Sequence, residues 1–180
     1  ATAGIEASAR RPAHYDYGSD QARRSVLLYA QADLLFYGNA ERALVDFAHR
    51  VAAGESPQQI RDLRGTAFIV KPHSEPASNI DTAEHGIVRL PDWQQLRHDP
   101  TAYARAARTI RQETNPHHAR TLVQGHGAQE VWVHPPPWPL ATAELDAHNE
   151  LPYARVPHPA YAGCTIQAWE MIRFSINNVR

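Results

Sequence analysis

The chain has 180 residues, of which 43% are hydrophobic and 21% are charged, a composition typical of a folded domain and not of a disordered chain. Lys and Arg total 18 against 19 Asp and Glu, so the net charge of −1 gives no general electrostatic basis for binding nucleic acid or an anionic membrane. The single cysteine, Cys164, excludes an intramolecular disulfide framework and any zinc or iron–sulfur site built from several cysteines of this chain.

Hydrophobic segments are short throughout the sequence. No apolar targeting region opens the chain, and no run approaches the roughly 18 residues that a membrane-spanning helix needs. We therefore expect a cytoplasmic protein that does not enter a membrane.

The first 30 residues predict the end of a strand followed by a helix. Residues 1–8, ATAGIEAS, resemble a strand end at which Gly4 lets the backbone turn sharply. Residues 20–32 carry apolar side chains at helical spacing, and Ser19 or Asp20 is a suitable N-cap.

A strand, a helix and a second strand follow at short spacing. Leu34–Tyr37 is a short apolar run that predicts a buried strand. Residues 40–53 predict an amphipathic helix with Asn39 as its N-cap and Gly54 just beyond its end. Residues 66–70, TAFIV, predict another strand. Such strand–helix–strand spacing favours an α/β fold with a parallel, doubly wound sheet.

The rest of the chain contains 12 of the 14 prolines and is divided into shorter pieces. The patterns predict a loop over 71–92, a helix over 100–113, a hairpin formed by Arg120–Gln124 and Glu130–His134, a short helix beginning at Thr142, and a strand over Trp169–Ile176.

Eleven histidines raise the question of a metal site. His117 and His118 are adjacent, so on a helix they would point about 100° apart and would not readily share one ion. No HExxH motif and no close cluster of His, Asp and Glu is present. We therefore expect structural histidines and no bound metal, and we interpret Cys164 as a packed thiol and not a nucleophile.

The densest polar stretch is RRPAHYDYGSDQARR, residues 10–24. It holds four arginines, one histidine, two tyrosines and two aspartates, which is rich in aromatic residues for a solvated loop. Two interpretations stay open: the arginines neutralise the aspartates in a structural network, or they line a pocket for an anionic group. The two are compatible if the network holds one wall of a pocket.

The turn at Gly38-Asn39 lies between a predicted strand and a predicted helix, where open α/β sheets bind ligands. The alternative is a plain capping turn. Loops that follow parallel strands gather at the carboxyl edge of the sheet, so the sequence predicts a shared pocket wall built from Arg10, Arg11, His14, Asp16, Gly38 and Asn39.

Long and specific blocks occur in order along nearly the whole chain, among them RRPAHYDY, LPYARVPHP and EMIRFS. These blocks resemble the YgiQ-type family of uncharacterised radical S-adenosylmethionine (SAM) proteins. The resemblance implies that 1–70 is the C-terminal part of a Rossmann-like domain similar to cobalamin-binding domains. It further implies that 71–160 is a connector with a helix and a hairpin, and that 161–180 contains the first strand of a radical SAM barrel.

The family pattern continues past EMIRFS with a CxxxCxxC loop that binds a 4Fe–4S cluster, and no position of this chain corresponds to it. The resemblance therefore implies a parent enzyme that uses the cluster to cleave SAM and acts on a small-molecule or macromolecular substrate. This segment would supply an accessory domain that packs with the remainder of the barrel, with no catalytic residue and no cofactor of its own. The alternative is a stand-alone Rossmann-like binding module for a nucleotide or a corrinoid.

Overall fold

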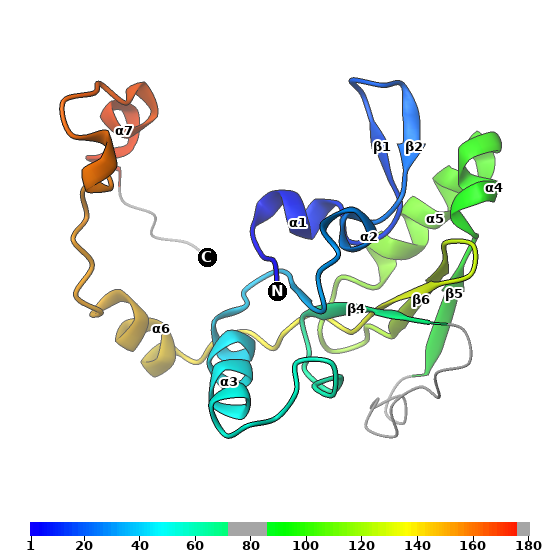
Figure 1. The fold of residues 1–180 in the computed structure, drawn as a ribbon, viewed down its shortest axis with the longest axis horizontal. Helices are drawn as coiled ribbons and strands as arrows, with labels where there is room; N and C mark the ends of the chain where they lie inside the picture. Colours follow the sequence, from blue (N-terminus) through cyan, green and yellow to red (C-terminus); the bar gives the residue numbers. More distant parts are fainter. Residues whose placement is uncertain (72–85, 176–180) are drawn as a thin grey trace. The chain divides into compact units, whose positions relative to one another are not determined.

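The structure is a computed structural model that describes residues 1–71 and 86–175 and consists of two compact units, residues 1–140 and 141–180. The first unit contains, in chain order, α1 (Ile5–Ala9), β1 (His14–Asp16), β2 (Gln21–Arg23), α2 (Val26–Ala30), β3 (Leu35–Phe36), α3 (Glu41–Ala52), β4 (Thr66–Val70), β5 (Ile87–Leu90), α4 (Trp93–His98), α5 (Pro100–Gln112), β6 (Thr121–Gly125) and β7 (Glu130–Val133) (Figure 1). The second unit contains α6 (Thr142–Asn149), a 3-10 turn (Pro159–Tyr161) and α7 (Gln167–Ile172).

The first unit is built on a five-stranded mixed sheet in the order β3-β4-β7-β6-β5. Only β5 and β6 pair in parallel, while the other neighbours are antiparallel. The α/β class is confirmed, but the expectation of a wholly parallel sheet is wrong. The domain boundary expected after Val70 falls at the end of β4, which pairs along its length with β7.

The orientation of β3 and β4 explains the departure from a parallel sheet. After α3, the chain turns at Gly54 and again at residues 56–59, so β4 begins beside the end of β3. The Tyr37 N–H donates to the Gly65 carbonyl at 2.8 Å, which joins the exit of β3 to the entry of β4. A strand–helix–strand unit gives a parallel pair only when the helix carries the chain back to the end of the sheet at which the first strand began.

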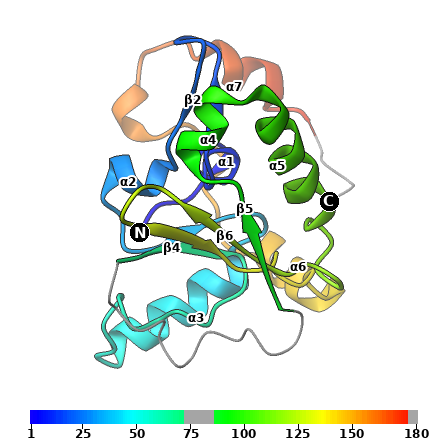
Figure 2. The same cartoon turned by 90° about the vertical axis from the view of Figure 1, so that its right-hand side faces the viewer.

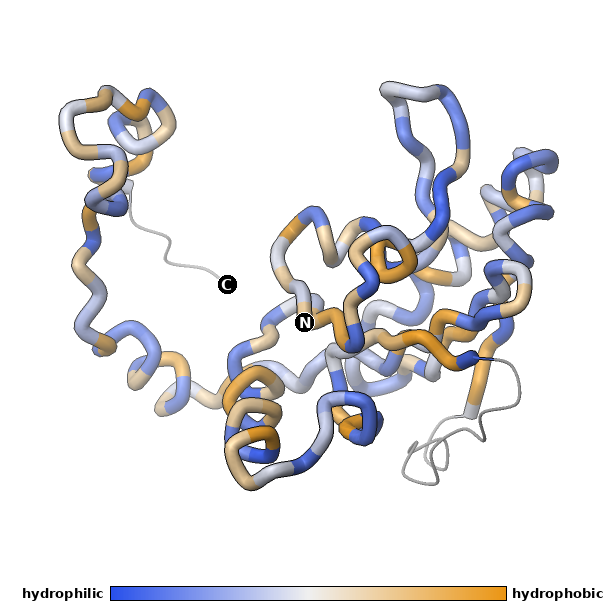
Figure 3. The backbone as a smooth tube through the Cα atoms, in the orientation of Figure 1, coloured by the Kyte–Doolittle hydropathy of each residue, from blue (hydrophilic) through white to orange (hydrophobic). Residues whose placement is uncertain are grey.

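Helices cover both faces of the sheet (Figure 2). On one face, Leu35, Ala67 and Val131 pack with Ala7 of α1 and Leu27 of α2. On the other face, a second core contains residues of α3, of the edge strand β3 and its approach, and of the central strands: Leu34, Phe36, Ala43, Phe68, Val123 and Trp132. The hydrophobic central strands contrast with the hydrophilic β1–β2 hairpin (Figure 3).

Several local predictions are confirmed. The helix over 40–53 is α3, and Gly54, with φ +94°, ends it where the glycine was expected. The Gly54 N–H bonds to the Val51 carbonyl and the Glu55 N–H bonds to the Arg50 carbonyl, each at 3.0 Å, which is the Schellman pattern. The helix over 100–113 is α5, the predicted hairpin is β6–β7, and the helix beginning at Thr142 is α6.

The helix predicted over 20–32 is wrong in its first half. Asp20 has φ +52° and turns the chain, so Ala22 pairs with Tyr15 in the β1–β2 hairpin. The helix begins only at Val26, because Ser25 caps it by accepting a hydrogen bond from the Leu27 N–H. At α3 the N-cap is Ala40 and not the predicted Asn39.

Two further predictions need correction. The loop expected over 71–92 contains strand β5, which pairs with β6, whereas residues 72–85 of that loop lie outside the described residues. The strand expected over Trp169–Ile176 is helix α7 as far as Ile172, and Ile176 lies outside the described residues. Because the second unit offers no described strand for pairing, this segment satisfies its N–H groups within a helix, as in the bond from Arg173 N–H to the Trp169 carbonyl.

Candidate functional site

The β1–β2 hairpin and α2 enclose a cavity of about 290 Å³, here called the hairpin pocket, which is lined by Arg10, His14, Asp16, Arg23, Val26 and Tyr29. Three of the six residues predicted from the sequence therefore line one cavity. Arg10 is exposed and pairs with Glu6 at 2.8 Å. The partial burial of His14 lowers the pKa of its imidazole, so this group is neutral at pH 7.

A hydrogen-bond network fixes the wall of the hairpin pocket. The Asp16 carboxylate accepts bonds from the Ser19 hydroxyl at 2.6 Å, the Gly18 N–H at 3.2 Å and the Arg23 Nε at 3.3 Å. The Ser19 and Gly18 bonds lower the pKa of Asp16. The polar residues of this stretch thus form both a network and a pocket wall.

The other three predicted residues lie elsewhere. Arg11 is half-buried with its guanidinium 4.3 Å from the centroid of the Tyr37 ring, and burial lowers the pKa of Arg11. Gly38 has φ +68° and lies against Pro137, and Asn39 is exposed. Arg11 therefore contacts the residue next to Gly38, but Arg11, Gly38 and Asn39 are not among the residues that line the hairpin pocket.

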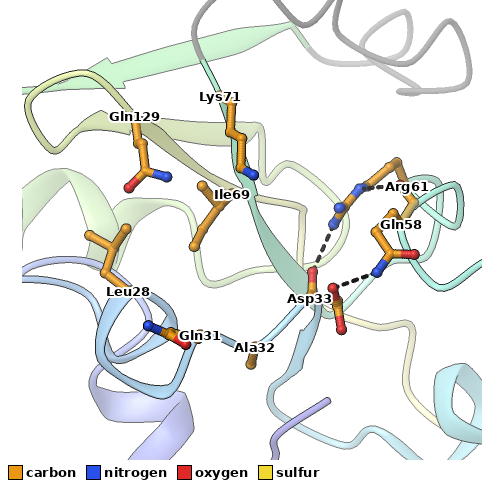
Figure 4. A pocket seen from close by; sticks show the side chains of 9 residues that line it. All are labelled: Leu28, Gln31, Ala32, Asp33, Gln58, Arg61, Ile69, Lys71 and Gln129. Atoms are coloured by element: carbon orange, nitrogen blue, oxygen red, sulfur yellow. Dashed lines mark hydrogen bonds between the residues drawn. The ribbon is translucent and has the colours of Figure 1, made fainter.

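A larger cavity of about 510 Å³, here called the sheet-edge pocket, lies where β4 ends and where β3 and β7 begin (Figure 4). Leu28, Ala32 and Ile69 supply its apolar lining. Its polar lining comes from four separate segments and consists of Gln31, Asp33, Gln58, Arg61, Lys71 and Gln129.

Sequence reasoning missed the sheet-edge pocket. Its one distinctive signal is Lys71, the only lysine in a chain with 17 arginines, placed directly after a strand. The other polar residues come together only because β4 runs antiparallel to both of its neighbours, and that pairing was not predicted.

A buried histidine lies in the turn between β6 and β7. His126 is 2% exposed, and neither of its ring nitrogens has a hydrogen-bond partner among the described residues. Burial lowers the pKa of His126 to about 4, while the carboxylate of Asp92 opposes this shift and the guanidinium of Arg24 adds to it.

The described residues contain no group of three or more His, Cys, Asp and Glu side chains that could hold a metal ion. Cys164 is exposed, which corrects its interpretation as a packed thiol. Within the same residues, no helix has the length and apolar character that crossing a membrane requires.

Comparison with known proteins places the chain in a family. A UPF0313 protein of Bradyrhizobium diazoefficiens is 51% identical over 189 residues, which covers 98% of this chain and 28% of the relative. The UPF0313 protein of Chromobacterium violaceum is 43% identical, with 98% of this chain and 31% of the relative covered. UPF0313 protein YgiQ of Escherichia coli is 42% identical, with 98% and 30% covered.

The chain thus spans about three tenths of the length of these relatives. No solved structure matches it. The family model described as Radical SAM N-terminal matches residues 1–175. The chain therefore belongs to the radical SAM N-terminal family and has UPF0313 proteins, YgiQ among them, as its relatives.

Proposed function

We propose that this chain is the N-terminal accessory part of a radical SAM enzyme in which the rest of a longer polypeptide holds the 4Fe–4S cluster and SAM. The observation that carries the proposal is the match of the Radical SAM N-terminal family to residues 1–175 in a chain with only one cysteine. The relatives, more than three times as long, have ample further sequence for a catalytic domain.

The residues of this chain do not fit a 4Fe–4S cluster. Such clusters are held by several cysteine thiolates, and one exposed thiol at Cys164 cannot replace them. The described residues also offer no cluster of His, Asp and Glu as substitute ligands. We therefore assign no step of radical chemistry to any residue of this chain.

The contribution of this chain is binding, and the hairpin pocket is its proposed substrate-facing surface. Arg10 and Arg23 line this cavity together with one carboxylate, Asp16, and the hydrogen bond from the Arg23 Nε to Asp16 holds Arg23 in place. Guanidinium groups bind carboxylate and phosphate oxygens through paired N–H donors, so the pocket suits an acidic group of the substrate.

The test begins with the reading frame beyond Arg180, where the proposal expects a CxxxCxxC motif, and a stop codon there would favour a stand-alone binding module. The full-length protein, reconstituted anaerobically and reduced, should release 5′-deoxyadenosine from SAM, whereas the 180-residue chain should release none. Arg10→Ala in the full-length protein should then slow turnover of the substrate but leave the melting temperature unchanged.

A further inference from the structure

Residues 93–112, which form α4 and α5, carry a positive charge that the composition of the whole chain conceals. This segment holds four arginines and one aspartate, so its net charge is +3, whereas the net charge of the whole chain is −1. Neither helix contains an Asp or a Glu, because the one carboxylate, Asp99, lies at the junction between them. Such a local excess of one charge attracts partners of the opposite charge.

The outward face of α5 carries most of this charge. The opposite face of the helix packs into the first unit through Ala102, Ala106 and Ile110. Three exposed arginines follow one another at intervals of three residues, so that their Cβ atoms lie about 5–6 Å apart and the row extends about 9 Å along the helix axis. This arginine row consists of Arg105, Arg108 and Arg111.

Two members of the arginine row have no partner within the described protein. The Arg105 guanidinium lies 3.7 Å from the carboxylate of Asp99, and both side chains are exposed. Within residues 1–71 and 86–175, the side chains of Arg108 and Arg111 form no hydrogen bond, ion pair or aromatic contact. Each of the other arginines in these ranges contacts a carboxylate, a carbonyl or an aromatic ring. The two guanidinium groups therefore offer all of their N–H donors to a partner.

Exposed tyrosine rings lie next to α5. The Tyr15 ring of β1 lies beside the Tyr103 ring of α5, with centroids 6.3 Å apart, and the Tyr15 N–H donates to the Tyr103 hydroxyl at 3.0 Å. Tyr17, in the turn of the β1–β2 hairpin, is 90% exposed, and the centroid of its ring lies 5.1 Å from that of Tyr15. The hairpin, which projects from the sheet (Figure 1), thus offers aromatic surface that a partner can reach.

A row of arginines beside exposed aromatic rings suits a single-stranded nucleic acid. Guanidinium groups bind phosphate oxygens through paired N–H donors, and unpaired bases stack on aromatic side chains. An acidic peptide would meet the charge but has no bases to stack. An anionic membrane fits poorly, because α5 exposes no large apolar side chain that could insert. Apart from its arginines, the helix exposes only Pro100, Thr101, Ala104, Ala107 and Gln112.

We propose that the arginine row and the adjoining hairpin form a docking surface for single-stranded nucleic acid, in which the arginines contact phosphates and Tyr17 stacks on a base. The proposal goes beyond the function proposed above and involves no radical chemistry. The chain would bind nucleic acid on this surface whether or not a longer polypeptide holds a cluster, so the two proposals fail separately.

The test is fluorescence anisotropy of a labelled oligouridylate of about 12 nucleotides, titrated with the 180-residue chain at several salt concentrations. We expect a Kd of about 100 µM or tighter at the lowest salt concentration. Three phosphate contacts predict that the logarithm of the association constant falls against the logarithm of the salt concentration with a slope of about −2.

A pair of double variants locates the binding surface. Arg108→Gln with Arg111→Gln should weaken binding about tenfold and reduce the size of the salt slope by about 1.4. The melting temperature should stay unchanged, because both side chains are exposed and glutamine is a good helix former. The control is Arg155→Gln with Arg173→Gln, which removes the same charge from exposed positions of the second unit and should leave binding unchanged.

Tyr17→Ala tests the stacking on a base. It should weaken the binding of oligouridylate about fivefold or more, because a base–aromatic stack is lost. It should leave the binding of inorganic polyphosphate unchanged, because this probe carries phosphates but no bases. The exposed position of Tyr17 makes an effect on folding small.

Three results would overturn the proposal. One is no binding of oligouridylate with the chain at up to about 1 mM and low salt. The second is an equal loss of affinity in the two double variants, because this would show that only the net charge matters. The third is tighter binding of polyglutamate than of oligouridylate, which would assign the arginine row to an acidic protein instead.

Discussion

The buried imidazole of His126 should make the first unit sensitive to mild acid. Burial lowers its pKa to about 4, against an ordinary value of 6.5. Between these two pH values the unfolded chain binds a proton that the folded chain does not, so the free energy of unfolding falls as the pH falls. A difference of about 2.5 pKa units corresponds to roughly 3 kcal/mol, present in full above pH 6.5 and lost as the pH approaches 4.

The measurement is chemical denaturation at a series of pH values between about 7 and 4. His126→Leu removes the titrating group and two ring nitrogens that have no hydrogen-bond partner among the described residues. The variant should be at least as stable as the wild type at pH 7, and it should lose about 3 kcal/mol less than the wild type between pH 6.5 and 4.

His14→Gln is the matched control, because the pKa of His14 is also lowered but its side chain is only partly buried. Its profile should follow the wild type more closely than that of His126→Leu. The reasoning is refuted if wild type and His126→Leu lose the same stability on acidification.

Three further predictions concern crowding, a cation–π contact and exposed apolar residues. Gly65→Ala should destabilise the first unit by about 2–4 kcal/mol, because φ is +71° and an added Cβ would lie 2.9 Å from Pro137 Cδ. Gly54→Ala is the control, because Gly54 also has a positive φ but has open space around it, and it should cost about 1 kcal/mol. Denaturant titration measures both changes in the free energy of unfolding. Arg11→Ala should lower the free energy of unfolding by about 1–2 kcal/mol, because it removes the contact with the Tyr37 ring. Arg10→Ala should change it by less than about 0.5 kcal/mol, because the Arg10–Glu6 pair is exposed. Equal effects of the two substitutions would contradict the buried position of Arg11 and the exposed position of Arg10. The second unit exposes Met171, Ile172 and Phe174, so the chain should bind a hydrophobic dye and form oligomers. Replacing Met171 and Phe174 by serine should reduce both signals, and a monomeric chain with a sharp melt and no dye signal would contradict this prediction.

Local sequence patterns correctly predicted the elements whose structure depends on residues close together in the sequence. Gly54 marks the end of α3 because its positive φ is a property of the residue itself. The β6–β7 hairpin is likewise local, since its strands are joined by the short turn around His126. The orientation of β3 relative to β4 depends instead on the path of the chain after Gly54, and the hydrophobic periodicity of the sequence does not indicate that path.

The same difference between neighbouring and distant residues of the sequence applies to the candidate sites. Arg10, His14 and Asp16 line one cavity, because His14 and Asp16 lie in β1 and Arg10 ends α1 only a few residues before that strand. Gly38 was expected beside them on the premise of a parallel sheet, and it lies against Pro137. The sheet-edge pocket joins Asp33, Arg61 and Gln129 across nearly 100 residues, and only the mixed sheet brings them together.

The iron content after anaerobic reconstitution tests the central claim most directly. The full-length protein should bind about four irons with the absorption of a 4Fe–4S cluster, and the 180-residue chain, treated identically, should bind none. Stoichiometric iron with a brown chromophore in the 180-residue chain, or a full-length protein that binds no cluster, would contradict the account.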